Sequence, residues 1–220
     1  MTKKSGFLLS VVMLLFIFFT GNINAKNNPK VWTGSWATAP QLVEPNNMPP
    51  APGLENNSLR QVIRVSIGGD VVRVRFANTF SKQPITLKNV AIAVSKDGSE
   101  IDAATQKSLK FSGQSSATIQ PGKDIFSDAL KFKLKSNSRL AITIAFGDVP
   151  DDITGHPGSR TTSFILSGNN VQSVDFAGAI PTDHWYVISS LDVQTKRKAG
   201  AVAVLGNSIA DGRGSGVNKQ

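Results

Sequence analysis

Short runs of β-branched and other apolar residues, separated by turn-forming residues, limit most strongly how this chain can fold. The clearest pair is residues 61–67 and 71–76, which flank Gly68-Gly69-Asp70. Runs of this kind are typical of β-strands, and a Gly-Gly-Asp sequence between two of them indicates a tight turn. We therefore expect the two runs to pair as a β-hairpin.

The same pattern continues along the chain, and helical periodicity is nearly absent before residue 205. About seven short strands with turns between them favour a mainly β fold. We expect an antiparallel β-sandwich, jelly-roll-like or immunoglobulin-like, over residues 26–197. The further expected strands are residues 85–94, 117–120, 130–134, 140–146, 161–166 and 185–193.

The first 25 residues have the layout of a secretory signal peptide. Lys3 and Lys4 give a positive start, residues 7–20 are almost wholly apolar, and a short polar stretch ends in Ala25. The apolar run is shorter than the roughly 20 residues needed to cross a bilayer. We expect cleavage near Ala25 rather than a membrane anchor, and hence a secreted or periplasmic protein without stable membrane insertion.

The chain is basic, but its basic residues are spread along it. Without Lys3 and Lys4, 22 Lys and Arg remain against 15 Asp and Glu. In residues 73–75 and 131–135 they alternate with apolar residues, which puts them on the solvent face of strands rather than in one groove. We therefore expect no nucleic-acid partner. The chain has no cysteine and only two histidines, so we also expect no disulfide, metal site or cofactor.

The pattern changes near the C-terminus. Residues 199–205 are a continuous run of small apolar residues, typical of a strand buried on both faces in a parallel sheet. Gly206-Asn207-Ser208 follows directly. A serine in this place lies at the carboxyl edge of the sheet, where α/β folds hold their sites. A helix beginning after it would offer backbone N–H groups to a developing oxyanion.

Four segments carry a resemblance to a known family. They are residues 32–40 (Trp-Thr-Gly-Ser-Trp-Ala-Thr-Ala-Pro), 59–69, 154–163 (Thr-Gly-His-Pro-Gly-Ser-Arg-Thr-Thr-Ser) and 204–212 (Val-Leu-Gly-Asn-Ser-Ile-Ala-Asp-Gly). In this order they resemble exported GDSL/SGNH-type hydrolases that have a β domain before the catalytic one. The last segment is similar to the nucleophile block of that family.

The resemblance implies an ester hydrolase in which Ser208 is the nucleophile and its backbone N–H is part of the oxyanion hole. Gly206, Asn207 and Asp211 would be supporting residues. The substrates would be acyl or acetyl esters on extracellular glycans or lipids. Residues 198–220 would be the start of a flavodoxin-like α/β domain.

The chain departs from the family pattern at two points. Asn207 stands where the family usually has aspartate, which preserves hydrogen-bonding capacity but not the charge. The later blocks of the family, which supply a glycine, an asparagine and an Asp-X-X-His pair, do not occur before residue 220. Because serine needs an adjacent base, we expect an N-terminal fragment of the enzyme, truncated after the nucleophile block and inactive alone. Such a fragment should expose residues 199–205 and aggregate readily.

Local residues offer little replacement for the missing base. His156 and His184 both lie in the β region and are expected to be structural or interface residues. Asp211 is expected to be a charge in the first turn of a helix rather than a catalytic partner.

A non-catalytic carbohydrate-binding or accessory β module is the alternative function. Trp32, Trp36 and Trp185 could stack on sugar rings, whereas the competing interpretation places these indoles in the core or at a junction with the next domain. Three tryptophans and one tyrosine in 220 residues argue against a broad aromatic platform.

Overall fold

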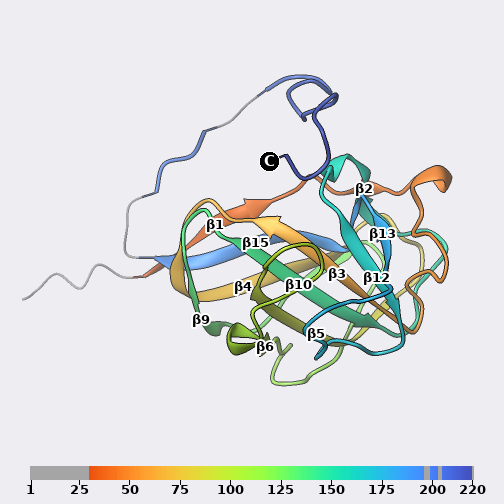
Figure 1. Cartoon of the computed structure of the whole chain (residues 1–220), viewed down its shortest axis with the longest axis horizontal. Coiled ribbons are helices and arrows are strands. Elements are labelled where there is room, and N and C mark those ends of the chain that lie inside the picture. The colour runs from red at the N-terminus through yellow and green to blue at the C-terminus, as the bar shows by residue number, and fades with distance from the viewer. Residues whose placement is uncertain (1–29, 196–198, 203–204, 220) are drawn as a thin grey trace, which may run out of the picture. The chain divides into compact units, whose positions relative to one another are not determined.

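The computed structural model describes residues 30–195, 199–202 and 205–219 (Figure 1). The expected signal peptide lies outside these residues. Within the described part of the chain, no helix is long and apolar enough to cross a membrane.

The fold is mainly β and antiparallel, as expected from the sequence, and its strands form three sheets. The five-stranded sheet has the order β1-β15-β4-β8, with β9 also paired to β4. Its strands are β1 (Val31–Ala37), β4 (Gly69–Asn78), β8 (Lys123–Phe126), β9 (Leu130–Leu134) and β15 (Ile188–Thr195).

The seven-stranded sheet has the order β13-β12-β3-β10-β5-β6, with β7 also paired to β5. Its strands are β3 (Asn57–Arg64), β5 (Ile85–Val94), β6 (Lys107–Ser108), β7 (Ala117–Ile119), β10 (Arg139–Phe146), β12 (Ser163–Ser167) and β13 (Ile180–Thr182). The small third sheet joins β2 (Gln41–Leu42), β11 (Thr154–His156) and β14 (Trp185–Tyr186) in the order β14-β11-β2.

One hydrophobic core lies between the two large sheets, as in a β-sandwich. In β4, Val72, Val74 and Phe76 are fully buried and alternate with half-buried residues. In β9, Phe132 and Leu134 are buried whereas Lys131 and Lys133 are exposed, as the alternating sequence predicts. From the other sheet, Leu140, Ile142 and Ile144 of β10 belong to the same core.

The opposite face of β10 is covered too, which explains why residues 140–146 form an unbroken buried run. Ala141 packs with Ala93 and Ile101, and Ala145 packs with Ala91 and Val171. Loops after β5 and β12 therefore cover the outer face of the seven-stranded sheet.

The prediction of a hairpin around Gly68-Gly69-Asp70 is wrong. Both runs form strands, but β3 lies in the seven-stranded sheet between β12 and β10, whereas β4 lies in the five-stranded sheet between β15 and β8. The chain crosses from one sheet to the other near Val65 and Ser66. The N–H of Val65 donates to the carbonyl of Ser138 at 3.0 Å, and the N–H of Ser66 donates to that of Ser35 at 2.9 Å.

The two glycines serve this crossing instead of a hairpin turn. A Cβ on Gly68 would clash with the carbonyl oxygen of Leu134, and one on Gly69 would lie 2.7 Å from that of Gln194. The turn residues correctly predicted a change of chain direction. They do not determine which strands pair. Each strand instead lies between two non-local neighbours, which bury both of its edges.

Other strand predictions need correction too, because the short strands β2, β6, β8, β11 and β13 were not expected. The first strand, β1, was not expected, and its Trp36 packs partly buried on the core while Trp32 does not. The single strand expected over residues 185–193 is divided into β14 and β15 at Val187, whose φ is +65°. A positive φ is uncommon for a β-branched residue and interrupts the ladder here.

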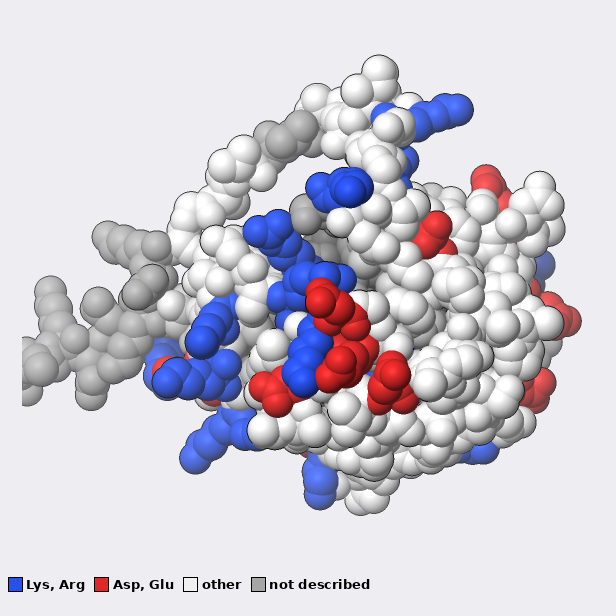
Figure 2. Space-filling model, viewed as in Figure 1, with Lys and Arg blue, Asp and Glu red and all other residues white. Residues whose placement is uncertain are grey.

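Basic side chains on the strands have acidic neighbours. Arg73 and Asp192 are 2.8 Å apart on the directly paired β4 and β15, and Arg75 forms an ion pair with Asp124 of β8. On the face shown in Figure 2, basic and acidic side chains likewise lie next to one another.

The expected buried strand over residues 199–205 is not formed by its described residues. Residues 199–202 and 205 have no strand pairing, and Val202 and Leu205 are 93% and 101% exposed; residues 203 and 204 lie outside the described part. A parallel strand needs neighbouring strands and covering helices, and this segment has neither in the described chain.

Candidate functional site

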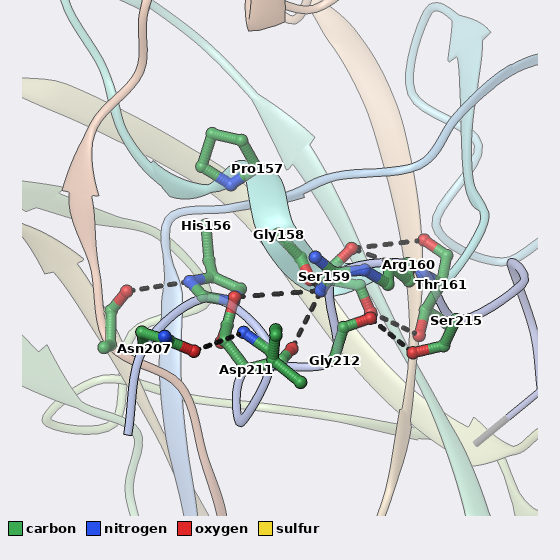
Figure 3. A network of polar contacts seen from close by, with 12 residues as sticks. His156, Pro157, Gly158, Ser159, Arg160, Thr161, Asn207, Asp211, Gly212 and Ser215 are labelled. Atoms are coloured by element: carbon green, nitrogen blue, oxygen red, sulfur yellow. Dashed lines mark hydrogen bonds and ion pairs between the residues drawn. The ribbon is translucent and has the colours of Figure 1, made fainter. Parts of the chain in front are cut away.

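A tight loop follows β11 and forms one side of the candidate site. β11 is held between β2 and β14, and Gly155 is needed there because a Cβ would lie 2.6 Å from Val43 Cγ2 and 2.8 Å from the carbonyl oxygen of Trp185. A short 3-10 turn, Pro157–Ser159, comes next and ends at Arg160 in the left-handed conformation with φ +49°. The strand and the turn together present His156 and Arg160 on the same side (Figure 3).

His156 is held in one orientation. Its Nδ1 lies 2.9 Å from the carbonyl oxygen of Ala39, and its ring stacks on Trp185 with centroids 6.1 Å apart. Since a carbonyl oxygen can only accept, Nδ1 carries the proton, and Nε2 is the nitrogen directed at the C-terminal segment.

The segment from Asn207 to Gly214 folds into successive turns. The side-chain oxygen of Asn207 accepts from Ile209 N–H at 3.0 Å, and its carbonyl accepts from Asp211 N–H at 3.2 Å. The carbonyl of Ser208 accepts from Arg213 N–H at 2.7 Å. The amide oxygen of Asn207 therefore makes a local bond that a carboxylate oxygen could also make.

The expected helix after Ser208 is absent from the described residues 205–219. Gly212 and Gly214 have φ of +89° and +93°, far from helical values. Because glycine adopts such angles freely and is a poor helix former, the sequence Asp-Gly-Arg-Gly-Ser-Gly favours turns. Asp211 is therefore not a charge in a helical first turn.

Asp211 instead joins the turn to the loop after β11 (Figure 3). Its carboxylate oxygens lie 3.8 Å from Nε2 of His156 and 3.7 Å from Nη1 of Arg160. The same Nη1 donates to the carbonyl of Asp211 at 2.9 Å and to that of Gly158 at 2.6 Å. All three residues belong to segments that carry the family resemblance, but no sequence pattern predicted this contact.

A second set of hydrogen bonds lies farther along the C-terminal segment. Asn218 donates from its backbone to the carbonyl of Arg160 at 2.8 Å, and its side chain bonds to N–H and Oγ1 of Thr162 at 3.0 and 2.8 Å. In Figure 1 the dark-blue C-terminal segment accordingly lies beside the loop that precedes β12.

A cleft of about 410 Å³ opens between the loop and the turn. Its lining includes the ring-bearing residues Trp36, His156 and Trp185 and the charged residues Arg160 and Asp211. Its volume is within the range of small-molecule sites, and its mixture of rings and polar groups is typical of them. Ser208 is exposed. It is close in sequence to the lining residues Ala210 and Asp211, but it does not line the cleft itself.

Two buried residues, Gln61 and Tyr186, stabilise β14, which pairs with β11 next to the site. The side chain of Gln61 bonds to both N–H and C=O of Tyr186, at 2.6 and 3.0 Å. Tyr186 donates its hydroxyl to the carbonyl of Asn47 at 2.8 Å. Burial raises the pKa of Tyr186 to about 12, and its contact with Thr182 acts in the opposite direction.

The two histidines have different roles. Nδ1 of His184 lies 2.6 Å from the carbonyl oxygen of Pro157, so this residue supports the loop. His156 faces Asp211. Within the described part of the chain neither histidine forms a hydrogen bond with Ser208, and the expectation that both are structural or interface residues agrees with these contacts.

The tryptophans do not form a common platform. Trp185 is 6% exposed and donates to the carbonyl of Val62 at 3.1 Å, and Trp36 packs edge-on against it with centroids 4.9 Å apart. Trp32 lies elsewhere, under the guanidinium of Arg73 at 4.4 Å. Among the described residues, no group of three or more His, Asp or Glu side chains could hold a metal ion.

Comparison of the sequence with models of protein families and with curated proteins gave no match.

Proposed function

We propose that this chain carries the nucleophile segment of an exported GDSL/SGNH-type hydrolase that acts on acyl or acetyl esters of glycans or lipids. Ser208 Oγ attacks the ester carbonyl carbon, and its own backbone N–H donates to the oxyanion. A base takes the Ser208 hydroxyl proton during the attack and returns it to the leaving oxygen, so the tetrahedral intermediate expels the alcohol and leaves the acyl group on Ser208. Water hydrolyses this acyl-serine in the second half of the reaction.

The observation that carries the proposal is the contact between two of the segments that resemble the family. Residues from the loop after β11 and from the turn that contains Ser208 meet at Asp211. Ser208 is exposed, and its N–H has no hydrogen bond within the described residues, so it is free to donate to a substrate oxygen. These features support a site at this turn.

The catalytic base is the missing part. Serine is a weak nucleophile without an adjacent base, and no histidine or carboxylate of the described chain bonds to the Ser208 hydroxyl. We therefore expect the purified chain alone to hydrolyse p-nitrophenyl acetate at the background rate. Turnover that disappears in Ser208→Ala would overturn this expectation of inactivity.

Added imidazole can replace a missing base and so tests Ser208 directly. The purified chain is incubated with p-nitrophenyl acetate and imidazole, and acetylated serines are quantified by peptide mass spectrometry. Ser208 should be acetylated on the order of tenfold faster than Ser215, an exposed serine of the same segment, because an N–H donor to the oxyanion favours acylation. Equal acetylation of the two serines would contradict the proposal.

The downstream coding sequence provides a second test. Reading the DNA after codon 220 in all three frames should reveal an Asp-X-X-His segment if the hydrolase assignment is correct. Its absence from every frame would favour the second candidate.

The second candidate is a non-catalytic carbohydrate-binding module, favoured by the two indoles at the cleft. Trp36 is the testable residue, because Trp32 on the same strand lies outside the cleft and gives a matched control. Binding of neutral oligosaccharides that Trp36→Ala abolishes and Trp32→Ala preserves, without any preference for acetylation at Ser208, would support this function.

A further inference from the structure

We propose that the loop after β11 is a docking site for the turn that contains Ser208, and that Arg160 is the positioning residue of this turn, acting through Asp211. The positioning role rests on the proposed function of Ser208 as the nucleophile, because it concerns where that residue is held for the reaction. The docking itself can be measured without any chemistry at Ser208.

Contacts within its own loop hold Arg160 in place. Its left-handed backbone and the bond from Nη1 to the carbonyl of Gly158 fix the direction of the guanidinium. The side chain of Arg160 is 20% exposed and that of Asp211 is 52% exposed, so their contact is only partly shielded from solvent. Arg160 bonds to the backbone carbonyl of Asp211 as well as facing its carboxylate, and it therefore restrains the backbone of the turn.

Gly158 lets the two segments approach. A Cβ on Gly158 would lie 2.9 Å from Oδ2 of Asp211 and 3.3 Å from Nε2 of His156. A Cβ on Gly212 would lie 3.1 Å from Oγ of Ser215 in the same segment, and only in ordinary contact, at 3.7 Å, with Nη1 of Arg160. A side chain on Gly158 would push Asp211 away from the loop, and one on Gly212 would also require a strained backbone because φ is +89°.

The attachment is polar at both ends. Asp211 forms one anchor and Asn218 the other, through its bonds to Arg160 and Thr162. Apolar side chains of the same segment contribute little, because Ile209 is 75% exposed and Leu205 is fully exposed. Polar contacts of this kind depend on geometry and on ionic strength more than on buried area.

Docking at Asp211 restrains Ser208 because the two residues share one turn. The carbonyls of Asn207 and Ser208 accept from the N–H groups of Asp211 and Arg213. Movement of Asp211 would therefore disturb the hydrogen bonds to the carbonyls of Asn207 and Ser208, which flank the Ser208 N–H. The β domain thus contributes a positioning residue to the site.

Hydrogen exchange of the amides of Asp211, Gly212 and Arg213 tests the proposal on the purified chain. Arg160→Asn removes the guanidinium but keeps a residue that tolerates a left-handed backbone. These amides should exchange on the order of tenfold faster, because a hydrogen bond to a charged donor is lost together with its ion pair. Lys133→Asn, which removes one charge from an exposed position of β9, should leave their exchange unchanged.

Charge reversal separates docking from simple loss of stability. Arg160→Asp should accelerate exchange as Arg160→Asn does, and combining it with Asp211→Arg should recover part of the protection. Sandwich amides should keep their protection throughout. Unchanged exchange in Arg160→Asn, or no recovery in the double variant, would overturn the role of Arg160.

Imidazole-assisted acetylation then distinguishes failure of this inference from failure of the proposed function. If Arg160 positions Ser208, acetylation of Ser208 should fall in Arg160→Asn and recover in the charge-reversed pair, together with the protection of the turn. Faster exchange with unchanged acetylation would contradict the positioning role. No preference for Ser208 in the unmodified chain would instead contradict the hydrolase proposal and leave the docking intact.

Discussion

Arg60 lies on β3 with no exposed surface, although it is a charged residue in a hydrophobic sheet. Its guanidinium donates to Thr143 Oγ1 at 3.0 Å and lies 4.0 Å from the centre of the Phe176 ring. It also donates to the carbonyls of Ser99, Ser173 and Val174. Burial lowers its pKa to about 10 and Asp175 acts in the opposite direction, so the group is still charged at neutral pH. Arg60 therefore links three loop carbonyls to the outer face of the sheet.

Arg60→Ala should lower the free energy of unfolding by about 3–5 kcal/mol, because it leaves buried carbonyl oxygens without donors and opens a cavity. Urea denaturation monitored by tryptophan fluorescence measures the change. Arg139→Ala is the control, since Arg139 is an exposed residue of the neighbouring strand, and it should change stability by less than about 0.5 kcal/mol. Equal effects of the two substitutions would contradict the structural role of Arg60.

Tyr186 is the only tyrosine, so its ionisation can be followed by tyrosinate absorbance without assignment. The folded protein should titrate near the pKa of about 12, against about 10 after denaturation. Because the neutral phenol is favoured by folding, its contribution to stability is complete below about pH 10 and is lost as the pH rises through about 12. Tyr186→Phe should reduce this loss of stability, and a folded-state midpoint near 10 would contradict the burial effect.

At the scale of single residues the sequence indicated candidate residues but not their contacts. Ser208, Asn207 and Asp211 were recognised from local order along the chain, and the side chain of Asn207 does make a local bond. The contact of Asp211 with His156 and Arg160 joins positions about 50 residues apart, which no local pattern encodes. Likewise nothing in the alternation of β3 indicated that Arg60 would be fully buried.

Among the elements, the crossing from β3 to β4 depends most clearly on particular residues. Gly69→Ala should destabilise the protein by about 1–3 kcal/mol, because the added Cβ would crowd the carbonyl of Gln194 and Val193. Gly34→Ala on β1 is the matched control, since nothing lies within 4 Å of a Cβ there. Thermal unfolding compares the two, and a Gly69→Ala variant as stable as Gly34→Ala would show that the crossing tolerates a side chain.

The positions of most longer strands were predictable, whereas strand partners and the short strands β2, β6, β8, β11 and β13 were not. β5 and β9 have the bounds expected from the alternation of residues. The separation of β3 from β4 was missed because pairing is decided by the burial of both strands between distant neighbours. The strand expected near residue 200 was missed for a related reason, since a continuous apolar run indicates burial only when covering elements are present.

For the molecule as a whole, the exposed apolar segment before Ser208 should govern solubility. Val202 and Leu205 are almost completely exposed, and residues 199–205 contain no charge. Such a run can associate with other chains. Val202→Lys with Leu205→Lys should reduce concentration-dependent light scattering and leave the thermal unfolding midpoint unchanged, because neither side chain contacts the sandwich. Unchanged scattering would show that association, where it occurs, uses another surface.

β1 pairs with β15 at one edge of the five-stranded sheet, and these two strands come from opposite ends of the β region. Val31 pairs with Thr195 and Ala37 with Ser190. A fold with contacts so distant in sequence has a high contact order and therefore folds slowly. On a chain that is synthesised from its N-terminus, the first strand has no partner until the last one has emerged. The five-stranded sheet should therefore be completed only after the whole β region has been synthesised.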